Sequence, residues 1–133
     1  MRRGERGSLA VYTAVVMLLL AVVVGLVVDG AGLVAASQQA DLVAREAARA
    51  GGNALDGTVV TGGPVRFDGP RARAAAEQVL RANGVTGTVT TDGDRVTVRT
   101  RVTYRPVVLA FGQPVVTGEA TAVAGRVQKG VRR

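Results

Sequence analysis

Cysteine, histidine and tryptophan are absent from this chain of 133 residues. Without cysteine there is no disulfide framework and no thiol chemistry. Without histidine the chain lacks the usual general base and the commonest metal ligand. Only two serines occur, Ser8 and Ser37, and both lie in the N-terminal part. These absences argue against an enzyme, and the sequence predicts no catalytic, metal-binding or cofactor-binding residue.

Aromatic residues are also scarce, with two tyrosines and two phenylalanines. The net charge of +7 would by itself suggest nucleic-acid binding. However, the excess lies at the two ends, because residues 9–125 carry ten arginines against nine acidic residues. Since the basic residues form no central patch and aromatic stacking platforms are few, we expect no nucleic-acid partner.

Residues 9–28 form an apolar run of twenty residues without a charge. A helix of this length covers about 30 Å, the thickness of the hydrocarbon core of a bilayer. Arg2, Arg3 and Arg6 precede the run, and Asp29 follows it. The positive-inside rule then predicts a single-pass protein of the cell membrane, with residues 1–8 in the cytoplasm and the chain from residue 29 onward outside.

A cleaved secretory signal is the alternative interpretation of this run. Small residues at 34–36 offer a cleavage site after Ala36, which would release a secreted binding module. The apolar region of a signal peptide usually spans about 7–15 residues, which is shorter than this run. The sequence also continues directly into a helical pattern, so we favour a retained anchor.

Residues 29–55 predict an alanine-rich helix outside the membrane. Its period indicates a helix from residue 33 to residue 50, which Gly51–Asn53 should end, with Gly30 and Gly32 as places for a kink. Small residues recur at four-residue spacing, and they continue into the apolar run. They are Ala21, Gly25, Gly32, Ala36, Ala40, Ala44 and Ala48.

Such spacing allows another helix to approach closely, so we predict that these residues form a helix-packing face. The simpler interpretation is that alanine recurs by chance in an alanine-rich chain. Because residues 29–55 contain few large apolar side chains, we do not expect this helix to belong to a domain core.

Residues 56–127 predict a small α+β domain outside the membrane, followed by a basic tail at 128–133. After a loop at 56–69, a helix begins near Asp68, has Pro70 in its first turn and ends at Asn83–Gly84. Its apolar side is Ala72, Ala75, Ala76, Val79 and Leu80.

A hairpin over residues 85–104 and a third strand after residue 113 complete a three-stranded antiparallel sheet. We expect a type I′ turn at Asp92–Gly93. In the second strand, apolar and polar residues alternate, as in a sheet covered on one side only. Glu119 should lie on the polar face beside the arginines. About 50 residues bury little apolar area, so the domain should rely on the long helix or on a partner chain.

Two polar clusters are candidate sites. Asp92 and Asp94 could pair as carboxylates or bind a metal, but a hairpin turn favours these residues in any case. The row Arg95, Arg99 and Arg101 could bind an anionic partner, although such a row is more often a solvated face.

Residues 6–55 resemble the N-terminal region of TadE/TadG-like pilus-assembly proteins. The motifs that carry the resemblance are Arg6-Gly7-Ser8, Asp29-Gly30, Ala40-Asp41, Ala47-Ala48 and Ala50-Gly51, in that order. Residues 67–127 look like the helix-plus-strands exterior of members from GC-rich bacteria. The resemblance implies a membrane-anchored role in tight-adherence (Flp-type) pilus assembly or secretion, with other pilus-assembly or pseudopilin subunits and membrane lipid as partners.

The resemblance also implies a possible processing site. In pseudopilin-like members, a prepilin peptidase cuts between the residues that correspond to Gly7 and Ser8. Those members usually carry glutamate at the fifth residue after the cut, where this chain has Tyr12. This departure favours an uncleaved, TadG-like accessory role over incorporation into a fibre.

Overall fold

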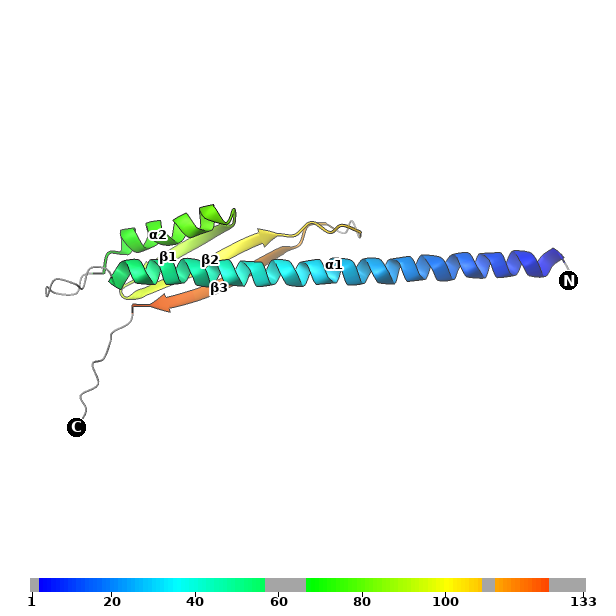
Figure 1. The fold of residues 1–133 in the computed structure, drawn as a ribbon, viewed down its shortest axis with the longest axis horizontal. Coiled ribbons are helices and arrows are strands. Elements are labelled where there is room, and N and C mark those ends of the chain that lie inside the picture. The colour runs from blue at the N-terminus through cyan, green and yellow to red at the C-terminus, as the bar shows by residue number, and fades with distance from the viewer. Residues whose placement is uncertain (1–2, 57–66, 109–111, 125–133) are drawn as a thin grey trace, which may run out of the picture.

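The structure is a computed structural model, and it describes residues 3–56, 67–108 and 112–124. The elements, in order, are α1 (Arg3–Asp56), α2 (Gly69–Ala82), β1 (Thr86–Asp92), β2 (Arg95–Thr103) and β3 (Val115–Val123). The predicted α+β architecture is confirmed: a long N-terminal helix, a second helix and a three-stranded antiparallel sheet. Figure 1 shows α1 as a rod, with the small domain built on the end away from the N-terminus.

Helix α1 is continuous over 54 residues, or about 80 Å. It passes Gly30 and Gly32 without the predicted kink, and Figure 1 shows it straight there. The predicted stop at Gly51–Asn53 is wrong, because the helix extends to Asp56. Gly51 and Gly52 are buried against the domain, so packing offsets the cost of about 0.5–1 kcal/mol for each helical glycine.

The two parts of α1 differ in their surroundings. Residues 9–28, called the apolar half, expose large side chains in every direction: the consecutive Leu18, Leu19 and Leu20 are 64%, 59% and 55% exposed. Residues 32–55, called the domain half, pack on the sheet. The most apolar stretch of 18 residues in α1 has a mean hydropathy of 2.9, so α1 is long and apolar enough to cross a membrane.

Helix α2 begins and ends as its sequence predicts. The Asp68 carboxylate accepts a hydrogen bond from the Arg71 N–H at 3.1 Å, and Pro70 occupies the first turn, where its missing N–H costs nothing. Asn83 caps the other end, followed by Gly84 with φ +64°. Ala72, Ala76 and Leu80 are buried, which confirms the predicted apolar side.

The sheet has the strand order β1-β2-β3, with both pairs antiparallel. The hairpin is confirmed, but its turn is not the predicted one. Asp92 pairs with Arg95, so Gly93 and Asp94 are the two turn residues, and only Gly93 has positive φ (+55°). A type I′ turn needs positive φ at both positions, whereas glycine at the first position fits type II′.

Both helices cover the same face of the sheet, and the core lies between them (Figure 1). From β2 it contains Val96 and Val98, both fully buried, and from α2 it contains Leu80. Val43, Ala47 and Leu55 of α1 belong to the same cluster. The small domain therefore relies on the long helix, as expected, and the expectation that this helix stays outside a core is wrong.

Candidate functional site

The outer part of the predicted helix-packing face is covered by the chain's own sheet. Ala40 and Ala44 are fully buried, Ala48 is 2% exposed and Ala36 is 9% exposed. The Thr100 hydroxyl donates a hydrogen bond to the Ala40 carbonyl oxygen at 2.8 Å. Strand β3 also lies against the helix backbone, since a Cβ added to Gly118 would lie only 2.5 Å from the Ala40 carbonyl carbon. At Ala40, strands of the same chain make the close approach, and the packing of another helix on this face stays a prediction.

The inner part of that face has a different environment. Ala21 is exposed, and Gly25, which has no side chain to expose, is buried. Only 6% of the most apolar 18-residue stretch of α1 is buried, and no other described helix lies along the apolar half (Figure 1). A partner helix on Ala21 and Gly25 therefore stays a prediction.

Asp29 lies at the junction of the two halves and holds the segment that follows β2. Its carboxylate accepts a hydrogen bond from the Val107 N–H at 2.8 Å. It also accepts from the Val108 N–H, at 3.2 Å and 3.3 Å to its two oxygens. Asp29 is 8% exposed. A buried carboxylate requires such donors, so this contact fixes the residues after β2 against one level of α1.

Tyr104 contacts α1 both at Asp29 and one helical turn further on, at Gly32. Partial burial raises the pKa of its phenol, and the neighbouring negative charge of Asp29 and a hydrogen bond with it raise the pKa further. The ring lies over Gly32, where a Cβ would meet the phenol hydroxyl and would lie 2.6 Å from Cζ. Gly32 therefore leaves room for Tyr104, which explains one member of the small-residue face.

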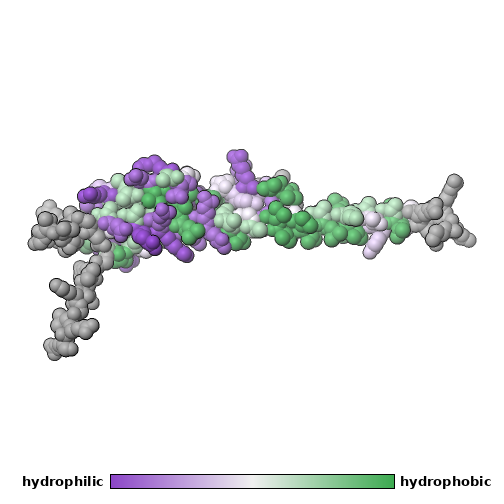
Figure 2. Space-filling view, viewed as in Figure 1, coloured by the Kyte–Doolittle hydropathy of each residue, from purple (hydrophilic) through white to green (hydrophobic). Residues whose placement is uncertain are grey.

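An exposed apolar surface adjoins this junction. Val107 is 81% exposed and Val108 is 51% exposed. Their N–H groups bind Asp29, which directly follows the exposed end of the apolar half, where Val27 is 65% and Val28 is 46% exposed. Figure 2 shows green, hydrophobic atoms gathered beside α1 where the domain meets the apolar half, while purple, hydrophilic atoms dominate the domain itself.

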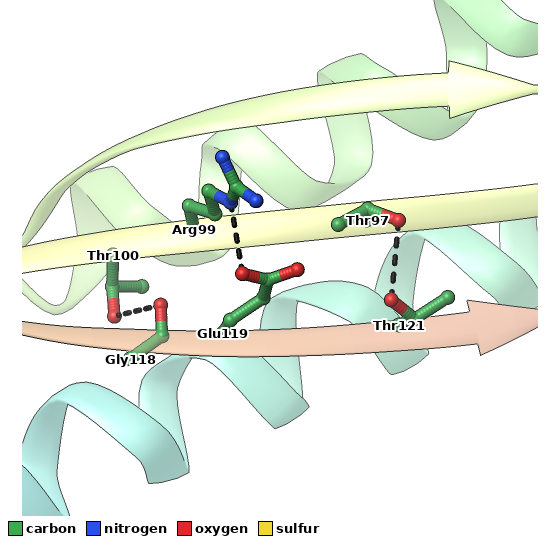
Figure 3. Close-up of polar contacts among 6 residues, drawn as sticks. All are labelled: Thr97, Arg99, Thr100, Gly118, Glu119 and Thr121. Atoms are coloured by element: carbon green, nitrogen blue, oxygen red, sulfur yellow. Dashed lines mark hydrogen bonds and ion pairs between the residues drawn. The ribbon is translucent and has the colours of Figure 1, made fainter.

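The outer face of the sheet carries the predicted arginine row. Arg95, Arg99 and Arg101 are all exposed, and Arg99 Nε lies 2.9 Å from Glu119 Oε2, which confirms the predicted position of Glu119. Beside them, the Thr97 and Thr121 hydroxyls lie 3.1 Å apart (Figure 3). An exposed ion pair contributes about 0–1 kcal/mol, so this row has the character of a solvated face.

Within the described ranges, no three histidine, cysteine, aspartate or glutamate side chains lie close enough to hold a metal ion. Asp92 and Asp94 flank Gly93, and the Asp94 carbonyl oxygen accepts a hydrogen bond from the Ala124 N–H at 2.7 Å. These residues close the hairpin and tie the end of β3 to it. The turn interpretation of this pair accounts for their positions.

The proposed processing residues lie at the start of α1. Gly7 and Ser8 are helical and exposed, and a Cβ on Gly7 would meet no atom within 4 Å. Tyr12 is 68% exposed. Cleavage between Gly7 and Ser8 stays a prediction. The expected tail at 128–133 and most of the loop at 56–69 lie outside the described residues.

Comparison of the chain with models of protein families, with curated proteins and with solved structures gives no significant match. The contact between Asp29, Tyr104 and the residues after β2 was not foreseen. In the sequence, Asp29 ends the apolar run and belongs to the Asp29-Gly30 motif, whereas residue 104 ends the predicted hairpin, and neither position indicates the other. An acidic residue directly after an apolar run, with a glycine three residues on, is the sequence signal that could have indicated it.

Proposed function

We propose that this protein is a membrane-anchored, TadE/TadG-like component of Flp/Tad pilus assembly or secretion. The observation that carries the proposal is the division of α1. One continuous helix exposes large apolar side chains over residues 9–28 and then forms part of the core of a polar domain. This division suits a helix that leaves a bilayer and presents a domain at its surface.

In the proposed topology, residues 1–8 lie in the cytoplasm, the apolar half crosses the membrane once and the α+β domain lies outside. Arg2, Arg3 and Arg6 before the span support this orientation through the positive-inside rule. The order of the Arg-Gly-Ser, Asp-Gly and alanine-rich motifs supports the family.

The proposed action is through protein contacts rather than chemistry. In the apolar half, Ala21 and Gly25 offer a place where the span of another pilus-assembly or pseudopilin subunit approaches closely. The absence of histidine and cysteine from the whole chain supports a non-enzymatic role. Tyr12, in place of the usual glutamate, favours an uncleaved accessory component.

The junction contacts count against the alternative of a secreted module. Cleavage after Ala36 would remove Asp29 and its hydrogen bonds to Val107 and Val108. It would also remove Gly32, over which the Tyr104 ring packs. It would also cut α1 four residues before Ala40, where the sheet rests on the helix.

Two measurements test the proposal. A reporter that is active only outside the cytoplasm, fused to the C-terminus, should be active, and a silent reporter would refute the topology. Mass spectrometry of the mature N-terminus should find Met1. Ser8 at the N-terminus would indicate prepilin-peptidase processing, and Ser37 would establish the secreted module instead.

A further inference from the structure

The segment that follows β2 has an unusual combination of a fixed backbone and exposed apolar side chains. The backbone N–H groups of Val107 and Val108 are held by Asp29, whereas their side chains are 81% and 51% exposed. Arg105, just before them, is also exposed. A segment that only connected two strands would not need its apolar side chains held in one exposed position.

The height of this segment along α1 is set by Asp29. Val107 N lies 2.8 Å from the Asp29 carboxylate, and residue 28 is the last of the apolar half. The polar interface of a bilayer is about 5–8 Å thick on each side of the hydrocarbon core. If residues 9–28 cross that core, Val107 and Val108 lie within this interface.

We propose that residues 105–108 form a second membrane contact, in which Val107 and Val108 enter the interfacial layer of the bilayer that α1 crosses. Arg105 lies at headgroup level, where a basic side chain meets lipid phosphate while its stem covers apolar surface. The inference rests on the membrane anchoring in the proposed function. It adds a lipid-binding surface that is separate from the span.

Continuity favours lipid as the occupant of this surface. The N–H groups of both valines bind Asp29, the residue directly after the apolar half, so a bilayer surface that covers the end of that half also reaches their exposed side chains. The Asp29 carboxylate, which would be costly at this depth without partners, accepts hydrogen bonds from the same segment. The contact also has a consequence for orientation: a single helix can rotate about its axis, but a helix with a second membrane contact cannot.

The test uses single cysteines, since the natural chain has none. Val107→Cys, Val123→Cys and Leu20→Cys are each labelled with the same environment-sensitive fluorophore in the full chain. Val123 is the matched control, because it is an exposed valine (52%) beside the hairpin turn at the far end of the sheet. Leu20 reports on the span. The labelled proteins are reconstituted into phosphatidylcholine vesicles that carry a lipid-attached quencher, placed near the headgroups in one set for Val107 and Val123 and at the middle of the acyl chains in another for Leu20.

The expected result is quenching of the Val107 probe by lipid several-fold greater than that of the Val123 probe, with the Leu20 probe also inside the bilayer. Quenching at Leu20 but equal, weak quenching at Val107 and Val123 overturns this inference and leaves the anchor standing. A Leu20 probe that lipid does not reach, but aqueous iodide does, overturns the anchor and this inference together. A Val107 probe shielded from both lipid and iodide indicates a second copy of the chain and also overturns the lipid contact.

Discussion

The two halves of α1 invert the usual relation between side-chain size and burial. In the apolar half, most leucines and valines are about half to two-thirds exposed, whereas Ala40, Ala44, Ala47 and Ala48 of the domain half are at most 2% exposed. In water, the large side chains would gain most from burial, at about 1.5–3 kcal/mol each. The apolar half lacks a protein partner in the described chain, and a bilayer would supply that environment.

The domain half uses small side chains for a geometric reason. Because Ala40 and Ala44 project little from the helix, β2 and β3 approach its backbone closely enough for Thr100 to donate to a helix carbonyl oxygen. Gly118 allows the same approach from the strand side. The stability of this contact comes from close packing of backbone against backbone, and any added side-chain volume should break it.

The largest expected effect is at Gly118. A side chain there would meet the backbone of Ala40 and Asp41, which cannot turn aside as a flexible side chain can. We expect Gly118→Val to destabilise the domain by about 3 kcal/mol or more, at the upper end of the range for overpacking. Urea unfolding of the full chain in detergent micelles, followed by hydrogen exchange of β2 and β3, measures the effect.

The control is the neighbouring Thr117→Val, which adds a β-branched apolar residue on the exposed side of the same strand. It should change the free energy of unfolding by less than about 0.5 kcal/mol. Equal effects of the two substitutions would refute the close approach of β3 to α1.

A smaller effect distinguishes the halves of α1 directly. Ala44→Leu places three extra carbon atoms under the sheet and should cost the domain about 1–3 kcal/mol. The same substitution in the apolar half, Ala21→Leu, should leave the unfolding free energy of the domain unchanged, since Ala21 is exposed. If Ala21→Leu instead disturbs pilus assembly while the domain stays folded, it supports the predicted packing face in the span. If Ala44→Leu and Ala21→Leu destabilise the domain equally, the claim that only the domain half of α1 packs on the sheet is refuted.

Local patterns in the sequence predict some features of this structure and not others. Alternation in β2 and the capping residues of α2 are local signals, and both predicted the observed elements. The four-residue spacing of small residues indicated close approach, but spacing on one helix cannot reveal whether a helix or a strand approaches. That information lies in Gly118 and Thr100, which are about 60–80 residues away in the chain and become informative only once the strands are paired.

The ends of elements were missed for a related reason. Gly51 and Gly52 would end an isolated helix, yet α1 stays helical to Asp56. Gly51 packs against Val96 and Ala72, and Gly52 packs against Ala122. At the junction, the Asp29-Gly30 motif does not reveal the partner of Asp29, because its contact with Tyr104 joins residues 75 positions apart. Long-range contacts of this kind define the candidate site, whereas local patterns define the elements.

The smallest effect tests the junction between the halves through the ionisation of Tyr104. In a Tyr12→Phe background, Tyr104 is the only tyrosine, so the alkaline absorbance change of the phenol reports on it alone. Its pKa should lie above the ordinary value of about 10, because of its partial burial and the adjacent Asp29 charge. Asp29→Asn removes the charge and should move the pKa of Tyr104 down towards that value.

Since folding favours the neutral phenol, the contribution of Tyr104 to stability is fully present below the ordinary pKa. This contribution is lost as the pH rises through the raised pKa of the folded state. The control Asp41→Asn removes a carboxylate from the same helix, twelve residues further on, and should leave the Tyr104 titration unchanged. If the titration midpoint of Tyr104 shifts equally in the two variants, or in neither, Asp29 and Tyr104 do not meet.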